Sequence, residues 1–233
     1  MHFILILLYY HKIFMILEIN SIYLYRNKKQ IFDNFNLKLK KKQILLLVGE
    51  NGVGKSSLMD MIVGLIQPNS GNVFIKGLHT NEICDKKKFF TYLPHKDSLK
   101  DNLTVEQNLT LWLELSSEYF NAKDLDKKLK FFGLLGLKKQ LVKTLSHGQR
   151  KKVSLTKLLM TNTDLWLLDE PFNGLDKKSC DLLKILLTKK ISGEGAVLLS
   201  SHIDPKIKEG KKVFLKKKIK NYNHRFFDTW EKL

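Results

Sequence analysis

The chain has 233 residues, which suits one domain of ordinary size rather than two. Its composition, 43% hydrophobic and 27% charged, supports a buried core and excludes a disordered chain. The formal net charge of +18 suits an anionic partner, and two cysteines exclude a disulfide framework and fit a reducing compartment.

The first fourteen residues are mostly apolar, but we do not expect them to form a membrane span. His11 interrupts them, and the uninterrupted stretch is shorter than the roughly 20 residues that a spanning helix needs. The segment also lacks the positive start and the small-residue cleavage site of a secretory signal. We interpret residues 1–14 as an apolar extension, and either Met1 or Met15 can be the initiator.

Two segments near the N-terminus alternate apolar and polar residues. They cover residues 17–25 and 31–39, on either side of a polar turn. This alternation predicts a two-stranded antiparallel unit. The next apolar run, residues 44–48, does not alternate, which predicts a strand buried on both faces.

Helices and strands are predicted in turn along the rest of the chain. We expect a helix over residues 56–65 that buries Leu58 and Leu65, and a short strand over 73–76. Residues 96–158 are polar and helix-rich, and the pair Thr104 and Gln107 forms a capping box there.

Two more apolar runs, residues 165–168 and 196–199, flank a helix predicted near 177–190. This order is typical of a parallel sheet with crossover helices. The lysine clusters are expected at loops or strand edges, and they cover residues 38–42, 86–88 and 211–218.

A glycine-rich loop lies between the strand at 44–48 and the helix that follows it. Its glycines let backbone N–H groups curl round a phosphate, and the helix N-terminus adds its positive dipole end. Lys55 would neutralise phosphate charge, and the Ser56 hydroxyl would ligate Mg²⁺. The plainer alternative is a glycine-rich turn, but the strand-to-helix context favours nucleotide binding. We expect contacts to the nucleotide from Gly49, Asn51, Gly52, Gly54, Lys55, Ser56 and Ser57.

Two carboxylates, Asp169 and Glu170, follow the apolar run at 165–168. They would lie at the carboxyl edge of the sheet, where open α/β folds bind ligands. Asp169 would hold Mg²⁺, and Glu170 would polarise the attacking water. Acidic pairs at strand ends are common, so this pair is weak support by itself.

Three further motifs accompany the acidic pair. Leu-Ser-His-Gly-Gln stands at residues 145–149, Pro-Phe-Asn-Gly-Leu-Asp at 171–176, and His202 follows an apolar run. Alone, Ser146 and Gln149 form an ordinary capping box, and a histidine after a strand is usually structural. With the glycine-rich loop and the acidic pair, they make five motifs. In their order along the chain, these five resemble the P-loop, signature, Walker B, D-loop and switch histidine of the ABC ATPases.

The resemblance implies an α/β P-loop NTPase fold with a RecA-like core, an antiparallel β-subdomain and a helical subdomain at about 96–158. It implies a single ABC ATPase domain over 15–218, with 219–233 as a basic C-terminal tail. The implied chemistry is ATP hydrolysis with Mg²⁺, in which Glu170 and His202 are catalytic.

The family also implies pairing of two copies head to tail. The signature residues of one copy close over the nucleotide that Lys55 of the other copy holds. These residues are Ser146, Gly148 and Gln149, and Asp176 belongs to the D-loop beside them.

Two positions are less well matched. Tyr25 is the best match for the aromatic side chain that stacks on adenine in the family, with Tyr23 as the alternative. Lys96 aligns with the glutamine that senses Mg²⁺, but lysine only donates hydrogen bonds and cannot ligate a metal. Lys96 would instead meet the γ-phosphate or the membrane partner.

Residues 95–109 resemble the CcmA family, the ATP-binding subunits of haem exporters in cytochrome c maturation. This resemblance implies CcmB-like and CcmC-like membrane subunits as separate chains, and haem export or release as the role. The implied location is peripheral on an inner membrane, at its cytoplasmic or mitochondrial matrix face.

Other interpretations remain open at this point. They are the ATPase of another small ABC transporter, a nucleotide switch without hydrolysis, and a nucleic-acid or ribosome-associated ABC ATPase. Proteins that bind phosphates and base edges in a bidentate manner favour arginine. Only three of the 41 basic residues in this chain are arginine. Codon bias in an AT-rich genome therefore explains the charge better, and we expect no nucleic-acid partner.

Overall fold

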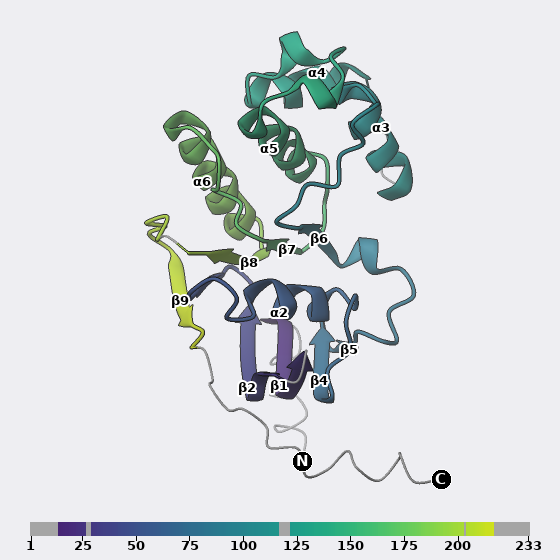
Figure 1. The fold of residues 1–233 in the computed structure, drawn as a ribbon. Helices are drawn as coiled ribbons and strands as arrows, with labels where there is room; N and C mark the ends of the chain where they lie inside the picture. The colour runs from purple at the N-terminus through teal and green to yellow at the C-terminus, as the bar shows by residue number, and fades with distance from the viewer. Residues whose placement is uncertain (1–13, 27–28, 117–121, 203, 217–233) are drawn as a thin grey trace, which may run out of the picture.

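The computed structural model describes residues 14–26, 29–116, 122–202 and 204–216. The apolar extension, but for Phe14, and the tail predicted at 219–233 lie outside these residues. Figure 1 shows two sheets, with helix α2 between them and the remaining α-helices on the far side of the second sheet.

The first sheet is antiparallel, with the strand order β2-β1-β4-β5. The predicted pairing of the first two strands is confirmed, because Leu17 is opposite Leu39 and Ile19 is opposite Leu37. The predicted short strand is the third member, and β5 extends the sheet. The four strands are β1 (Met15–Arg26), β2 (Lys29–Lys40), β4 (Ser70–Ile75) and β5 (Leu78–His79).

The second sheet is parallel throughout, in the order β6-β7-β8-β3-β9. The predicted parallel sheet is thus confirmed, with β3 flanked on both sides. Its strands are β6 (Phe90–Leu93), β7 (Leu165–Leu168), β8 (Ala196–Ser201), β3 (Ile44–Val48) and β9 (Gly210–Phe214).

Two hydrophobic cores lie on the opposite faces of the parallel sheet. Successive side chains of a strand point to opposite faces, so Leu45 and Leu47 of β3 join the core shared with the antiparallel sheet and α2. Ile44 and Leu46 join the core beneath the other helices. Burial on both faces is why these strands lack polar alternation.

The predicted helix after the glycine-rich loop is α2 (Lys55–Ile62), and it is shorter than predicted. Gly64 adopts a left-handed conformation with φ of 79°, so the helix ends before it. Leu65 is consequently 70% exposed, and the prediction that it lies on the buried face is wrong. Leu58 is fully buried, as expected.

The remaining α-helices lie on the other side of the parallel sheet from α2 (Figure 1). Thr104 and Gln107 make both bonds of the predicted capping box in front of α3. Asp176 caps α6 by accepting a hydrogen bond from the N–H of Ser179 at 2.8 Å. The α-helices are α3 (Val105–Ser116), α4 (Ala122–Phe131), α5 (His147–Thr156) and α6 (Lys177–Ser192).

Short 3₁₀ turns join these elements, and they are η1 (Lys86–Lys88), η2 (Leu135–Leu137), η3 (Val142–Thr144) and η4 (Lys157–Leu159). The limits of the helical subdomain at about 96–158 and of the ATPase domain at 15–218 stay predictions. None of the helices in the described ranges has the length and apolar character needed to cross a bilayer.

Candidate functional site

A pocket of about 530 Å³ opens where the loops after β3, β6, β7 and β8 meet the end of β1 and the start of β2. The carboxyl ends of parallel strands meet at one edge of a sheet, and open α/β folds bind ligands there. The lining residues are Arg26, Lys29, Ile31, Asn51, Gly52, Gly54, Lys55, Ser56, Ser57, His95, Glu170, Asn173 and His202.

The glycine-rich loop between β3 and α2 forms one wall of this pocket. Gly54 is the N-cap of α2 with φ of 108°, a conformation that L side chains rarely adopt. A Cβ at Gly54 would also lie 2.5 Å from the Cγ2 atom of Ile31. The turn therefore needs glycine, and it brings the N-terminus of α2 to the pocket.

Lys55 is a buried lysine that points back into this loop. Its side chain is 7% exposed, and Nζ donates to the carbonyl oxygens of Gly49 at 2.7 Å and Glu50 at 3.1 Å. Nζ also lies 3.8 Å from Oε1 of Glu170. The ammonium group thus connects the glycine-rich loop with the acidic pair after β7.

Glu170 and His202 both line the pocket and contact each other. Nδ1 of His202 lies 3.0 Å from Oε2 of Glu170, which also accepts from the backbone N–H of His202 at 3.3 Å. Glu170 has φ of 49°, a left-handed conformation that costs free energy in a non-glycine residue. Its own N–H donates to Oγ of Ser200 at 2.9 Å, which helps to hold that conformation.

Asp169 lies deeper than Glu170. It is 2% exposed, its carboxylate accepts a hydrogen bond from Ser200 Oγ, and it is absent from the pocket lining. Its N–H donates to the carbonyl oxygen of Leu93 at 2.9 Å. The acidic pair is therefore fixed to the neighbouring strands β6 and β8.

Most of the predicted nucleotide contacts line the pocket. Gly49, Tyr25 and Lys96 do not, although Lys55 contacts Gly49 directly. Tyr25 is half-buried, and its N–H donates to Oδ1 of Asn69 at 2.8 Å. The role of Tyr25 in stacking on adenine stays a prediction.

The pocket also contains five residues that sequence reasoning did not select. Arg26 is the last residue of β1 and Lys29 is the first residue of β2, and Nη1 of Arg26 lies 3.4 Å from Oγ of Ser57. His95 lines the pocket, whereas the neighbouring Lys96 does not. His95 could have been identified from the sequence by its position just beyond the strand β6. Ile31 and Asn173 complete the set.

The predicted signature residues lie outside their own chain's pocket. Ser146 caps α5 by accepting from the N–H of Gln149 at 3.3 Å, and Gln149 Oε1 accepts from the N–H of Ser146 at 2.8 Å. A Cβ at Gly148 would lie 2.9 Å from the carbonyl oxygen of Gly174. The start of α5 therefore packs closely on the loop after the acidic pair.

An ion pair reinforces that packing. Nζ of Lys152 lies 2.7 Å from Oδ2 of Asp176. The hydrogen bond from Lys152, with those from Ser179, holds the pKa of Asp176 well below its ordinary value. Asp176 is thus ionised at neutral pH while it caps α6.

The chain resembles several known proteins. The family model described as ABC transporter matches residues 32–173. A "Cytochrome c biogenesis ATP-binding export protein CcmA" of Rickettsia bellii is 41% identical, covering 78% of this chain and 90% of that protein. CcmA of Reclinomonas americana is 34% identical, covering 93% of this chain and 96% of that protein.

The chain belongs to the ABC transporter family, in its CcmA branch. The predicted fold class is confirmed, and membership makes the chain an ABC-type ATPase. A solved dimeric post-hydrolysis ATP-binding cassette, bound to ADP and Pi, shares the fold. Its TM-score is 0.75 at 23% identity, and the match covers 86% of this chain and 94% of that one.

A second lysine of this ABC ATPase, Lys157, is only 3% exposed. Its burial predicts how the free energy of unfolding depends on pH. Burial lowers its pKa to about 8, although the charge of Asp97 opposes this. An unfolded lysine ionises at about 10.5, so the unfolded chain holds the proton more tightly. The contribution of Lys157 to stability is therefore unfavourable below pH 8 and improves as the pH rises from about 8 to about 10.5.

We expect this group alone to add about 3 kcal/mol to the free energy of unfolding across that window. Lys157→Met keeps the apolar part of the side chain and removes the titrating amine. The free energy of unfolding of the variant should therefore lack this rise with pH. Urea unfolding of both proteins at pH 7.5 and pH 10 measures the difference. Parallel pH profiles for the two proteins would contradict the prediction.

Proposed function

We propose that this chain hydrolyses Mg-ATP to drive an exporter that moves or releases haem for c-type cytochrome biogenesis. The observation that supports it best is the convergence of Lys55, Glu170 and His202 on one pocket beside the N-terminus of α2. The names of the CcmA relatives, as ATP-binding export proteins of cytochrome c biogenesis, support the pathway.

The glycine-rich loop would hold the phosphates through its backbone N–H groups and the dipole of α2. Lys55 would exchange the carbonyl oxygens of Gly49 and Glu50 for phosphate oxygens, because an ammonium group pairs more strongly with an anion. Arg26 and Lys29 add two cations at the rim of the same pocket. Together these groups offset the charge of a triphosphate.

Glu170 is the proposed general base. Its carboxylate takes a proton from the attacking water while the water oxygen bonds to the γ-phosphorus. The bond from that phosphorus to the β–γ bridging oxygen breaks, and ADP and phosphate are formed. His202 orients the carboxylate, since Nδ1 and Oε2 are within hydrogen-bond distance at 3.0 Å.

Magnesium fits the oxygen groups at this edge of the sheet. Hard divalent cations prefer hydroxyl and carboxylate oxygens, and the exposed Ser56 hydroxyl lines the pocket. Ser56 and the carboxylate of Asp169 would hold Mg²⁺, which neutralises charge on the phosphates when bound. Asp169 lies deeper, so it would act through the ion's water shell.

Two copies would pair head to tail, with the signature of each closing over the ATP of the other. Ser146, Gly148 and Gln149 stand at the N-terminus of α5, which offers backbone N–H groups to a phosphate. The related dimeric cassette supports such pairing. Separate CcmB-like and CcmC-like chains would supply the membrane path and hold the ATPase at an inner membrane.

Copurification tests this assignment. We expect the tagged chain, extracted with detergent from its own cells, to bring down a small set of membrane proteins together with haem. A matched control carries Glu18→Gln, which alters a half-buried residue of β1 that does not line the pocket. Recovery of nucleic acid instead, with retention that falls steeply with salt, would favour the nucleic-acid alternative and contradict the export role.

A further inference from the structure

A second, much smaller cavity lies where α5 and η4 meet the segments that follow β6 and β7. Its volume is about 10 Å³, which is room for one water-sized group. It shares no lining residue with the nucleotide pocket. Leu93, Leu155 and Pro171 form part of its apolar wall, so the polar side chains that also line it stand in a mostly apolar setting.

Three of these polar side chains come from one face of α5 and of the turn η4 that continues it. Lys151, Ser154 and Lys157 recur at every third residue, and residues three apart lie on the same side of a helix. All three line the cavity, and they are 8%, 6% and 3% exposed, respectively. This face therefore brings two ammonium groups and a hydroxyl group to a space that is largely shielded from bulk water.

Two of the three groups lack a hydrogen-bond partner among the residues that the structure describes. Oγ of Ser154 is buried there without a partner, and Lys151 forms neither a hydrogen bond nor an ion pair. A buried hydroxyl group without a partner costs free energy, and a buried ammonium group costs more. Both donors are thus available to a ligand in the cavity.

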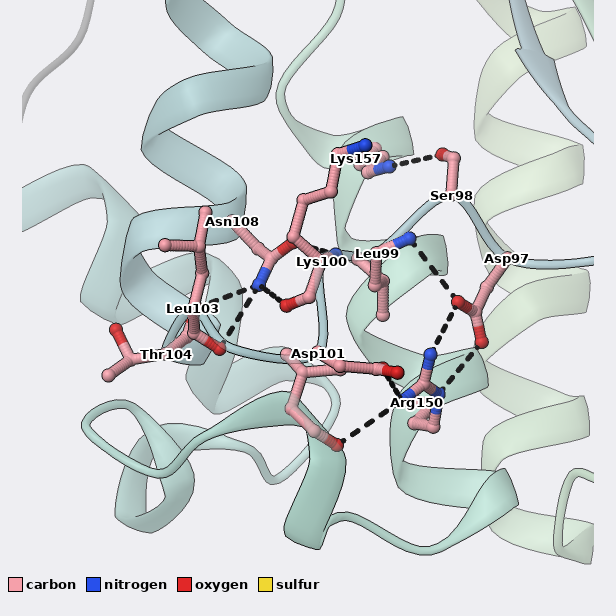
Figure 2. A network of polar contacts seen from close by, with 11 residues as sticks. Asp97, Ser98, Leu99, Lys100, Asp101, Leu103, Thr104, Asn108, Arg150 and Lys157 are labelled. Atoms are coloured by element: carbon pink, nitrogen blue, oxygen red, sulfur yellow. Dashed lines mark hydrogen bonds and ion pairs between the residues drawn. The ribbon is translucent and has the colours of Figure 1, made fainter.

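The amine of Lys157 contacts a hydroxyl group and an aromatic ring, neither of which is an anion. Its Nζ lies 3.2 Å from Oγ of Ser98, a contact that Figure 2 shows, and 5.8 Å from the ring centre of Trp112. Asp97 also lines the cavity, but its two carboxylate oxygens accept from Arg150 at 2.9 and 3.0 Å. Because Arg150 offsets the charge of Asp97, the two lysines leave the cavity positively charged.

The pKa values of the two lysines agree with this charge balance. Burial lowers the pKa of both, to about 8 in the case of Lys157. The charge of Asp97 opposes this lowering for both lysines, and the charges of Asp169 and Glu170 also oppose it for Lys151. Since the pKa of each lysine nevertheless stays low, these carboxylates do not compensate for burial, and a closer anion would stabilise both ammonium groups.

We propose that the cavity binds a single monatomic anion, such as chloride, between the two ammonium groups and the hydroxyl group of Ser154. An anion accepts hydrogen bonds from all three donors and offsets the charge of both cations. Phosphate, sulfate and carboxylates have several heavy atoms and exceed the volume of the cavity. A water molecule fits but leaves the charge unpaired. The site is separate from the nucleotide pocket, so it does not depend on the proposed function.

Urea unfolding at neutral pH, in sodium chloride and in sodium gluconate of equal ionic strength, tests the site. Gluconate is too large for the cavity, so only chloride can bind. Chloride at about ten times its Kd shifts the unfolding equilibrium about tenfold, and we expect the urea midpoint to be roughly 0.5 M higher in chloride. The rise of stability with pH expected for Lys157 should accordingly be larger in gluconate than in chloride.

Two variants of the cavity and one matched control assign the effect to this site. Lys151→Met and Ser154→Ala each remove one donor, and each should reduce the difference between the two salts to less than about 0.2 M. The control is Lys130→Met, which removes an exposed lysine of α4 that does not line the cavity. This control should keep the full difference, because it changes the net charge of the chain equally but leaves the three donors in place.

Equal urea midpoints of the unmodified chain in the two salts would overturn the inference, because water alone would then occupy the cavity. An equal loss of the response in Lys130→Met and in the cavity variants would also overturn it, because surface charge would then cause the response. If Lys151→Met does not fold, Ser154→Ala decides by itself. Loss of a buried hydroxyl group without a protein partner should not disrupt the fold, and a full response in this variant would contradict the site.

Discussion

Replacing Glu170 by glutamine is expected to slow ATP hydrolysis by roughly 10²-fold or more, about 3 kcal/mol of barrier. The amide has nearly the same shape but cannot accept the proton of the attacking water. Its oxygen can still accept from the backbone N–H of His202, now 3.3 Å from the carboxylate, so the pocket should keep its form. Phosphate release under single-turnover conditions measures the chemical step, and Mg-ATP affinity should change by less than about 3-fold.

The same variant should accumulate the head-to-tail pair, because the ATP that holds it closed is consumed slowly. Light scattering with and without Mg-ATP detects the change in mass. Adding Ser146→Arg to the Glu170→Gln chain supplies the control, since a bulky cation at the start of α5 should block closure without touching the monomer's own pocket. Normal turnover by Glu170→Gln would show that Glu170 is not the base.

Patterns that arise from local chemistry allowed the central sheet to be predicted from the sequence. A strand buried on both faces has to be apolar throughout, and β3 and β7 are so in every residue. The glycine-rich loop is equally visible, because the turn at Gly54 cannot accept a side chain. These features place the phosphate loop and the acidic pair at one edge of the sheet.

Non-local pairing limited the prediction elsewhere. Strand β9 contains Lys211 and Lys212, which suggested only a strand edge or loop, yet it pairs in parallel with β3 and closes that side of the sheet. Arg26 and Lys29 reach the pocket because the end of β1 and the start of β2 lie beside the glycine-rich loop. No local pattern in the sequence encodes that approach.

The segment after β6 shows that a shift of one residue changes which side chain is assigned to the pocket. The sequence predicted that Lys96 meets the γ-phosphate or the membrane partner, whereas the neighbouring His95 lines the pocket and Lys96 does not. The strand ends at Leu93, so the irregular backbone after it decides which side chain lines the pocket. Backbone geometry outside regular elements does not follow a periodic pattern, and the contact of Lys96 stays a prediction.

Replacing Lys55 by alanine is expected to weaken Mg-ATP binding by roughly 10²-fold or more, about 3 kcal/mol. The ammonium group is buried, where the local dielectric strengthens its attraction for an anion. Its removal also leaves the carbonyl oxygens of Gly49 and Glu50 without their charged donor, so the loop itself should lose order. Isothermal titration with Mg-ATP measures the affinity.

Lys29→Ala is the matched control, because this lysine lines the same pocket but is exposed to water. A screened charge contributes little, so this change should weaken binding by less than about 5-fold. The contrast separates the specific role of the buried ammonium from the general positive charge of the chain. Equal losses in the two variants would mean that the net charge of +18, rather than the geometry of the glycine-rich loop, attracts the nucleotide.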